Sequence, residues 1–196
     1  MSWAFLTRAN SERDLIDELG SSFKPRQAAE GLVSAEARPK RHDGHLAELA
    51  FARQAMKVAG TAPTDPPRLM KALASALADH EPKRAREGTW TWALQVVAPD
   101  GNDPLDPRRK VAAAIEEALE AQLADALPAS VQARRVGDAE ADRLLQVWVG
   151  TPDKAWIGLT AGTQVQSRVA GGKTKLKRPA DAVSRSGLKL EEAIGW

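Results

Sequence analysis

Apolar residues recur at strand and helix spacing in the first 60 residues. Residues 2–8 predict a short strand. Ser11 is expected to cap a helix that Gly20 ends. The apolar face of this helix consists of Leu15, Ile16 and Leu19. Two further apolar runs, near 28–35 and 49–58, predict strands separated by a basic, polar segment.

The pattern changes after this region. Residues 60–67 contain three prolines, a glycine and two threonines, which favours a linker. A helix is expected from Pro66, a half-buried strand over 89–96, and a long helix opened by Asp106 and Pro107. A hairpin is predicted within 144–160. The second part therefore has the order helix, strand, helix, strand, strand.

These elements predict an α+β fold in two domains. Residues 1–60, with one strand, one helix and two strands, are expected to form a ferredoxin-like layer. Residues 64–163 form a second small α/β domain. Residues 164–196 are expected to form a basic linker and a short final helix that Ser184 caps.

Composition narrows the class of protein. The 196 residues are 43% hydrophobic and 28% charged, which is ordinary for a globular protein. The chain has no cysteine, so disulfides and thiolate metal sites are excluded, and no segment approaches the length of a membrane span. A cytoplasmic protein is expected. No metal site is predicted, because His42, His45 and His80 lack partners at ligand spacing.

Basic residues gather in three places, although the net charge is only +2. A cluster opens the long helix, a pair follows that helix, and five cations lie among glycines in the predicted linker. Each group suits phosphate contacts, and a solvated surface is the alternative. The residues expected to contact RNA are Arg108, Arg109, Lys110, Arg134, Arg135, Arg168, Lys173, Lys175, Lys177 and Arg178.

Two other features point to structure more than to chemistry. Trp90, Trp92 and Trp148 lie in predicted strands and are expected in the core. Gly172, Lys173 and Thr174 match the end of a phosphate-binding loop, but Ser167 takes the place of the first glycine. No nucleotide site is predicted there.

The last 22 residues, KLKRPADAVSRSGLKLEEAIGW, resemble a known family. They are similar to the linker and first helix of the bacterial 23S ribosomal RNA cytidine 2′-O-ribose methyltransferases of the M type. Val183 replaces a proline usual in that family, and Phe51 to Gln54 resemble a second, weaker motif. The resemblance implies a ferredoxin-like domain, a THUMP-type RNA-binding domain and a linker to a Rossmann-type methyltransferase domain.

The same resemblance assigns a role to Lys189. It corresponds to one lysine of a Lys-Asp-Lys-Glu tetrad, and S-adenosylmethionine is the cofactor of the complete family enzyme. The cofactor-binding strand and glycine-rich turn would follow residue 196. The chain by itself is therefore expected to end before the catalytic domain, to hold no cofactor and to be inactive.

The function predicted from the sequence is recognition of ribosomal RNA for a methyltransferase. A separate methyltransferase-domain polypeptide is one possible partner. The alternatives are a stand-alone RNA-binding protein and a protein-interaction module with no RNA role, which the nearly balanced charge favours.

Overall fold

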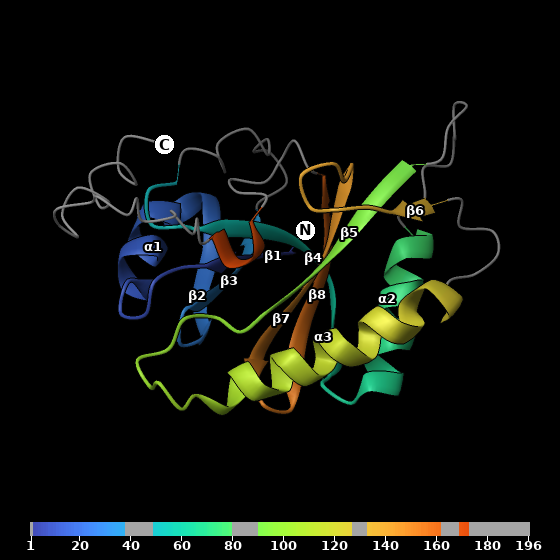
Figure 1. The fold of residues 1–196 in the computed structure, drawn as a ribbon. Coiled ribbons are helices and arrows are strands. Elements are labelled where there is room, and N and C mark those ends of the chain that lie inside the picture. Colours follow the sequence, from blue (N-terminus) through green and yellow to red (C-terminus); the bar gives the residue numbers. More distant parts are fainter. Residues whose placement is uncertain (1, 38–48, 80–89, 127–132, 162–168, 173–196) are drawn as a thin grey trace, which may run out of the picture.

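The computed structural model describes residues 2–37, 49–79, 90–126, 133–161 and 169–172, and within them the chain is of the predicted α+β class (Figure 1). Eight strands form one mixed sheet in the order β2-β3-β1-β4-β8-β7-β5-β6. The elements are β1 (Ser2–Leu6), α1 (Glu12–Leu19), β2 (Phe23–Ala29), β3 (Leu32–Ala37), β4 (Gln54–Pro63), α2 (Pro66–Asp79), β5 (Trp90–Val97), α3 (Pro107–Ala126), β6 (Ala133–Arg135), β7 (Arg143–Thr151) and β8 (Lys154–Ala161).

In the first part of the sheet, β1 lies between β3 and β4 and pairs antiparallel with both. Its alternate side chains separate to the two faces, so Trp3 and Phe5 pack with Leu15 and Leu19 of α1. The predicted strand and helix are confirmed. The expected cap differs in detail, because Ser11 stands at the N-cap position but its side chain makes no capping hydrogen bond.

The prediction of one strand near 28–35 is wrong. These residues span the turn between β2 and β3, which Gly31 makes with a φ of +73°. The apolar pattern missed β2 because it lies at the sheet edge and has exposed polar side chains, Lys24 and Arg26 among them.

The linker predicted over 60–67 is also wrong for its first four residues, which belong to β4. This strand pairs with β1 through Gln54–Lys57 and with β8 through Val58–Pro63, with an irregularity between Val58 and Gly60. Figure 1 shows β4 arching from the first part of the sheet to the second. The sheet is thus continuous across the proposed boundary between the two domains.

In the second part, α2 and α3 cover one face of β4, β5, β7 and β8. The predicted helix starts are confirmed at Pro66 and Pro107, and the predicted hairpin is β7–β8. Trp92 and Trp148 are buried as expected. The side chain of Trp90 lies outside the described residues.

The opposite face of the sheet joins the two parts. Ala4, Leu6 and Leu32 from the first part form one buried cluster with Met56 and Trp148. None of the helices within the described segments has the length and apolar character needed to cross a membrane.

Candidate nucleic-acid interface

Of the three basic residues at the start of α3, two have exposed side chains and one has a buried side chain. Arg109 and Lys110 are exposed, as a phosphate-binding role requires. Arg108 is only 6% exposed. The structure therefore keeps Arg109 and Lys110 as candidates and places Arg108 where a phosphate backbone does not reach it.

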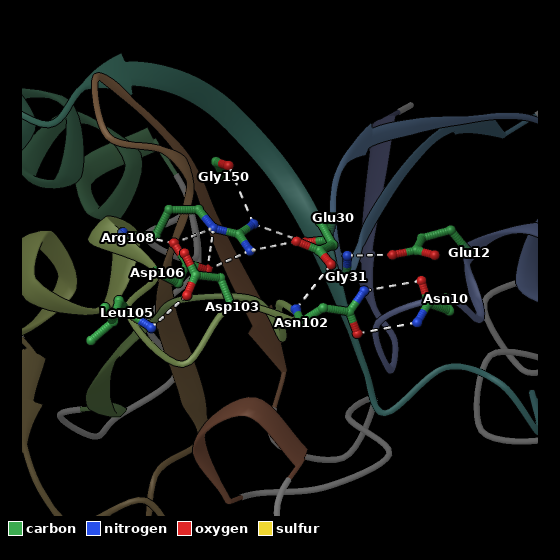
Figure 2. A network of polar contacts seen from close by, with 10 residues as sticks. All are labelled: Asn10, Glu12, Glu30, Gly31, Asn102, Asp103, Leu105, Asp106, Arg108 and Gly150. Atoms are coloured by element: carbon green, nitrogen blue, oxygen red, sulfur yellow. Dashed lines mark hydrogen bonds and ion pairs between the residues drawn. The ribbon is translucent and has the colours of Figure 1, made fainter.

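The guanidinium of Arg108 is engaged inside the protein (Figure 2). Its Nη2 lies 2.6 Å from Asp106 Oδ2, and its Nε donates to the same carboxylate at 2.8 and 3.0 Å. Its Nη1 donates to the carbonyl oxygens of Glu30 at 2.8 Å and Gly150 at 3.5 Å. The hydrogen bonds from Arg108, opposed in part by burial, hold the pKa of Asp106 below its ordinary value.

Neighbouring contacts extend this network to both sides of the β2–β3 turn. Glu30 Oε1 accepts from the backbone N–H of Asn102 at 2.9 Å, and the side-chain amides of Asn10 and Asn102 exchange two hydrogen bonds of 3.1 Å. Glu12 accepts from the Gly31 N–H at 2.6 Å (Figure 2). We call the contacts of Arg108 with Asp106, Glu30 and Gly150 the Arg108 clasp. It ties the β2–β3 turn to the start of α3 and the end of β7.

Arg135 lies far from the cluster at the start of α3. Its guanidinium pairs with Glu120 at 2.7 Å and stands 5.9 Å from the centroid of the Trp92 ring. Glu120 is eleven residues beyond Arg109, or roughly 16 Å along the helix axis. Arg135 and the exposed pair Arg109 and Lys110 therefore lie toward opposite ends of α3. The side chain of Arg134 lies outside the described residues.

The remaining site predictions also fall outside the described residues. They are Arg168, Lys173, Lys175, Lys177, Arg178 and Lys189, together with the histidines His42, His45 and His80. Their roles stay predictions. Within the described residues, no group of three or more histidine and acidic side chains is placed to hold a metal ion.

A buried polar network, which the sequence did not indicate, lies on the sheet face opposite α2 and α3. Gln54 and Gln146 donate to Gln95 Oε1 at 3.0 and 3.3 Å, and Thr160 donates to Gln146 at 3.0 Å. The N–H of Gly171 donates to Gln54 at 3.1 Å. Gln95 in turn donates from Nε2 to the carboxylate of Asp138 at 2.8 Å. The amides and the hydroxyl of this network do not titrate near neutral pH, and their role is to fix the 169–172 segment against the sheet.

A second unpredicted feature is a groove of about 440 Å³ between the β2–β3 hairpin and strands β4 and β8. Its lining includes Lys24, Arg26, Ser34, Glu36, Thr61 and Trp156. Strands β2 and β8 are four positions apart in the sheet order, or about 19 Å in a flat sheet. The sheet must therefore curl for both to line one groove, and the Arg108 clasp joins the two sides of that curl.

Positive charge predominates at this groove. Lys24 and Arg26 are exposed residues of its lining, and Lys154, outside the lining, places its Nζ 5.0 Å from the centroid of the Trp156 ring. Glu36 is the acidic residue of the lining. A lysine–tryptophan contact at an exposed site contributes only ~0.5–1 kcal/mol. Lys154 can thus leave the ring at little cost.

These features define an α+β protein with one curled mixed sheet, a cationic groove and exposed cations at the start of α3. The chain is similar over nearly its whole length to a protein named ribosomal RNA large subunit methyltransferase M from Alkalilimnicola ehrlichii. The two are 31% identical over an aligned length of 207 residues, which covers 99% of this chain and 52% of that protein. The chain thus spans about half the length of this curated relative. No protein-family model matches the chain.

Several solved structures share a weaker likeness over 81% of the chain. PH1313 from Pyrococcus horikoshii is 10% identical with a TM-score of 0.48, over 54% of its own length. TrmN from Thermus thermophilus is 17% identical with a TM-score of 0.45, over 45% of its length. A 4-thiouridine synthetase in complex with RNA and ATP is 14% identical with a TM-score of 0.41, over 40% of its length. Likeness at this level identifies neither the fold nor the function.

Proposed function

We propose that this chain is the RNA-recognition part of a methyltransferase that acts on large-subunit ribosomal RNA. The observation that carries the proposal is the similarity to the Alkalilimnicola ehrlichii protein, which extends over 99% of the chain at 31% identity. The motif at 175–196 supports the finer assignment to the cytidine 2′-O-ribose methyltransferases of the M type. The protein is expected to act in the cytoplasm.

In this proposal residues 1–60 are a ferredoxin-like domain, residues 64–163 a THUMP-like domain and residues 164–196 the link to catalysis. The α+β composition of the described residues supports it. Strand β4 and the cluster around Trp148 join the two parts of the chain. The two parts would therefore present their RNA-binding residues in one fixed arrangement.

Catalysis would involve Lys189, whose ammonium suits the orientation of a ribose hydroxyl or the stabilisation of its developing negative charge. S-adenosylmethionine would be held by a methyltransferase domain, in the same polypeptide or a separate one. The rival function is a stand-alone RNA-binding or protein-interaction module with no methyltransferase partner. The formal net charge of only +2 favours a protein partner in that case.

The test is binding of the purified chain to a fragment of large-subunit ribosomal RNA across a series of KCl concentrations. We expect the logarithm of the association constant to fall linearly with the logarithm of the salt concentration, because each phosphate contact releases counterions. Replacing Arg109 and Lys110 with Ala should reduce the slope by about one to two. Lys71 is an exposed cation of α2, and its replacement with Ala serves as the control. Absence of binding at low salt would contradict the proposal.

A further inference from the structure

We propose that the groove between the β2–β3 hairpin and β8 receives an unpaired RNA nucleotide, with Trp156 against the base and Lys24 and Arg26 on the phosphates. The inference rests on the proposed function and deepens it. It names the part of the RNA that this surface selects: a single-stranded segment rather than a duplex.

The size of the groove favours one nucleotide. Its volume of about 440 Å³ lies within the range of roughly 300–1,000 Å³ typical of small-ligand pockets. A duplex does not enter a space of this size, and its paired bases are already stacked on one another. Unpaired bases, in contrast, can turn outward and stack on aromatic side chains.

The cations on the hairpin are placed to follow a backbone. Lys24 and Arg26 are two residues apart on β2, so both side chains project from the same face at a spacing of about 7 Å. Both are exposed. Arg26 donates one hydrogen bond, from Nε to Ser34 Oγ at 3.3 Å, which orients a guanidinium that has five N–H donors.

Trp156 is a partly exposed aromatic residue of the groove. The backbone of β7 against one face of its ring fixes the position of the ring. Its ring lies directly on Gly150, where an added Cβ would approach the ring carbon Cζ3 to 2.1 Å. The carbonyl of Gly150 is itself held by the Arg108 clasp. The ring is therefore a preformed surface, and the Lys154 ammonium above it can move to a phosphate when a base takes its place.

The remaining polar groups of the lining suit a base edge. Glu36 lies across from Lys24 in the β2–β3 register. Its exposed carboxylate is an acceptor for the exocyclic amino group of an unpaired base. Cations for phosphate, an aromatic ring and an acceptor thus occur together in one groove.

The experiment compares a single-stranded RNA of about 14 nucleotides with a blunt-ended duplex of equal charge made from two complementary strands of about seven nucleotides, using fluorescence anisotropy of labelled RNA. We expect the single strand to bind more tightly. Lys24→Ala with Arg26→Ala should weaken its binding roughly 10-fold, and should weaken duplex binding much less. The matched control is Arg68→Ala with Lys71→Ala, which removes the same charge from the exposed surface of α2 and should change binding less than about 2-fold.

A second pair of variants tests stacking. Trp156→Leu should weaken single-strand binding roughly 10-fold and Trp156→Phe clearly less, because phenylalanine retains an aromatic face. Circular dichroism and thermal unfolding test whether each variant is folded. If Trp156→Leu does not fold, the double variant Lys24→Ala with Arg26→Ala and the variant Trp156→Phe still test the groove site. Equal losses in the groove and control pairs, with RNA binding otherwise intact, would overturn the groove site and leave the proposed function standing. Failure of the unaltered chain to bind any RNA would overturn both.

Discussion

Arg108 is a buried cation whose guanidinium joins three parts of the protein. It contacts the Asp106 carboxylate and the carbonyl oxygens of Glu30 and Gly150. Arg109, the next residue, is exposed. Removing the charge from a buried pair leaves its partner without a cation in a poorly solvated site, and Asp106 would keep only the hydrogen bond from the backbone N–H at position 108 among its contacts with that residue. The two arginines should therefore differ greatly in their contribution to stability.

We predict that Arg108→Met lowers the free energy of unfolding by about 3–5 kcal/mol at pH 7, because methionine fills much of the space but leaves the Asp106 charge unpaired. Arg109→Met, the matched control, should change it by less than about 0.5 kcal/mol. Urea unfolding followed by circular dichroism measures both. Similar values for the two variants would mean that the clasp does not hold the fold together.

The same pair makes a pH-dependent contribution. The pKa of Asp106 lies below its ordinary value of 3.8 in the folded protein, chiefly through the hydrogen bonds from Arg108. A depressed folded pKa adds stability that is fully present above pH 3.8 and is lost as the pH falls through the folded value. The difference between the unaltered chain and Arg108→Met should therefore be largest near neutrality and shrink toward pH 3. A difference independent of pH would argue against the ion pair as its cause.

At the scale of elements, the β2–β3 hairpin depends on its turn. Gly31 has a φ of +73°, and a Cβ there would lie 2.3 Å from the carbonyl oxygen of Asp100. Gly20 also has a positive φ, of +54°, but has open space around it. Comparing substitutions at the two glycines therefore distinguishes the cost of backbone strain from the cost of steric contact.

We predict that Gly31→Ala lowers the free energy of unfolding more than Gly20→Ala does. Both substitutions introduce backbone strain of about 1–3 kcal/mol. Only the alanine at position 31 also pushes against a neighbouring backbone, which adds roughly 1–3 kcal/mol. Chemical denaturation of the two variants in parallel measures the difference. Equal losses would show that Asp100 moves aside without cost.

The elements differed in how well their sequences predicted them. Helices α1, α2 and α3 were found because apolar residues recur at helical spacing between recognisable ends. Strand β2 was not, since an edge strand buries little of its surface and its polar side chains resemble those of a loop. Strand β4 was read as a linker over Gly60–Pro63, where proline and glycine hid a pairing partner almost a hundred residues away.

At the scale of the whole molecule, the two parts share a sheet and a core. Trp148 of β7 is fully buried among Ala4, Leu6 and Leu32 of the first part and Met56 of β4. Cutting the chain near residue 60 would therefore expose apolar surface on both sides. The parts should unfold together.

We predict that Trp148→Ala destabilises both parts equally, by about 3–5 kcal/mol. Hydrogen exchange of amides in β1 and β3 should accelerate by the same factor as in β7 and β8, because one cooperative opening exposes all of them. Leu105→Ala, at a position 83% exposed, is the control and should leave both regions unchanged. Faster exchange confined to β7 and β8 would show that the first part holds its structure independently.

The candidate sites show a similar division. Sequence clustering identified Arg109 and Lys110 as exposed cations, but it grouped Arg108 with them because burial is not visible in a run of like charges. It had no signal for the groove, where Lys24 and Trp156 are more than 130 residues apart in the chain.

By itself, the sequence determined the α+β class, the three helices, strands β1, β5, β7 and β8, and the full-length resemblance to a ribosomal RNA methyltransferase. These follow from local periodicity, end signals and residue order, which act over a few positions. Only the tertiary structure decided which strands pair, that β4 joins the two parts, that Arg108 is buried, and that Lys24, Arg26 and Trp156 line one groove. Such outcomes depend on the curl of the sheet and on contacts between distant segments, which local preferences do not encode.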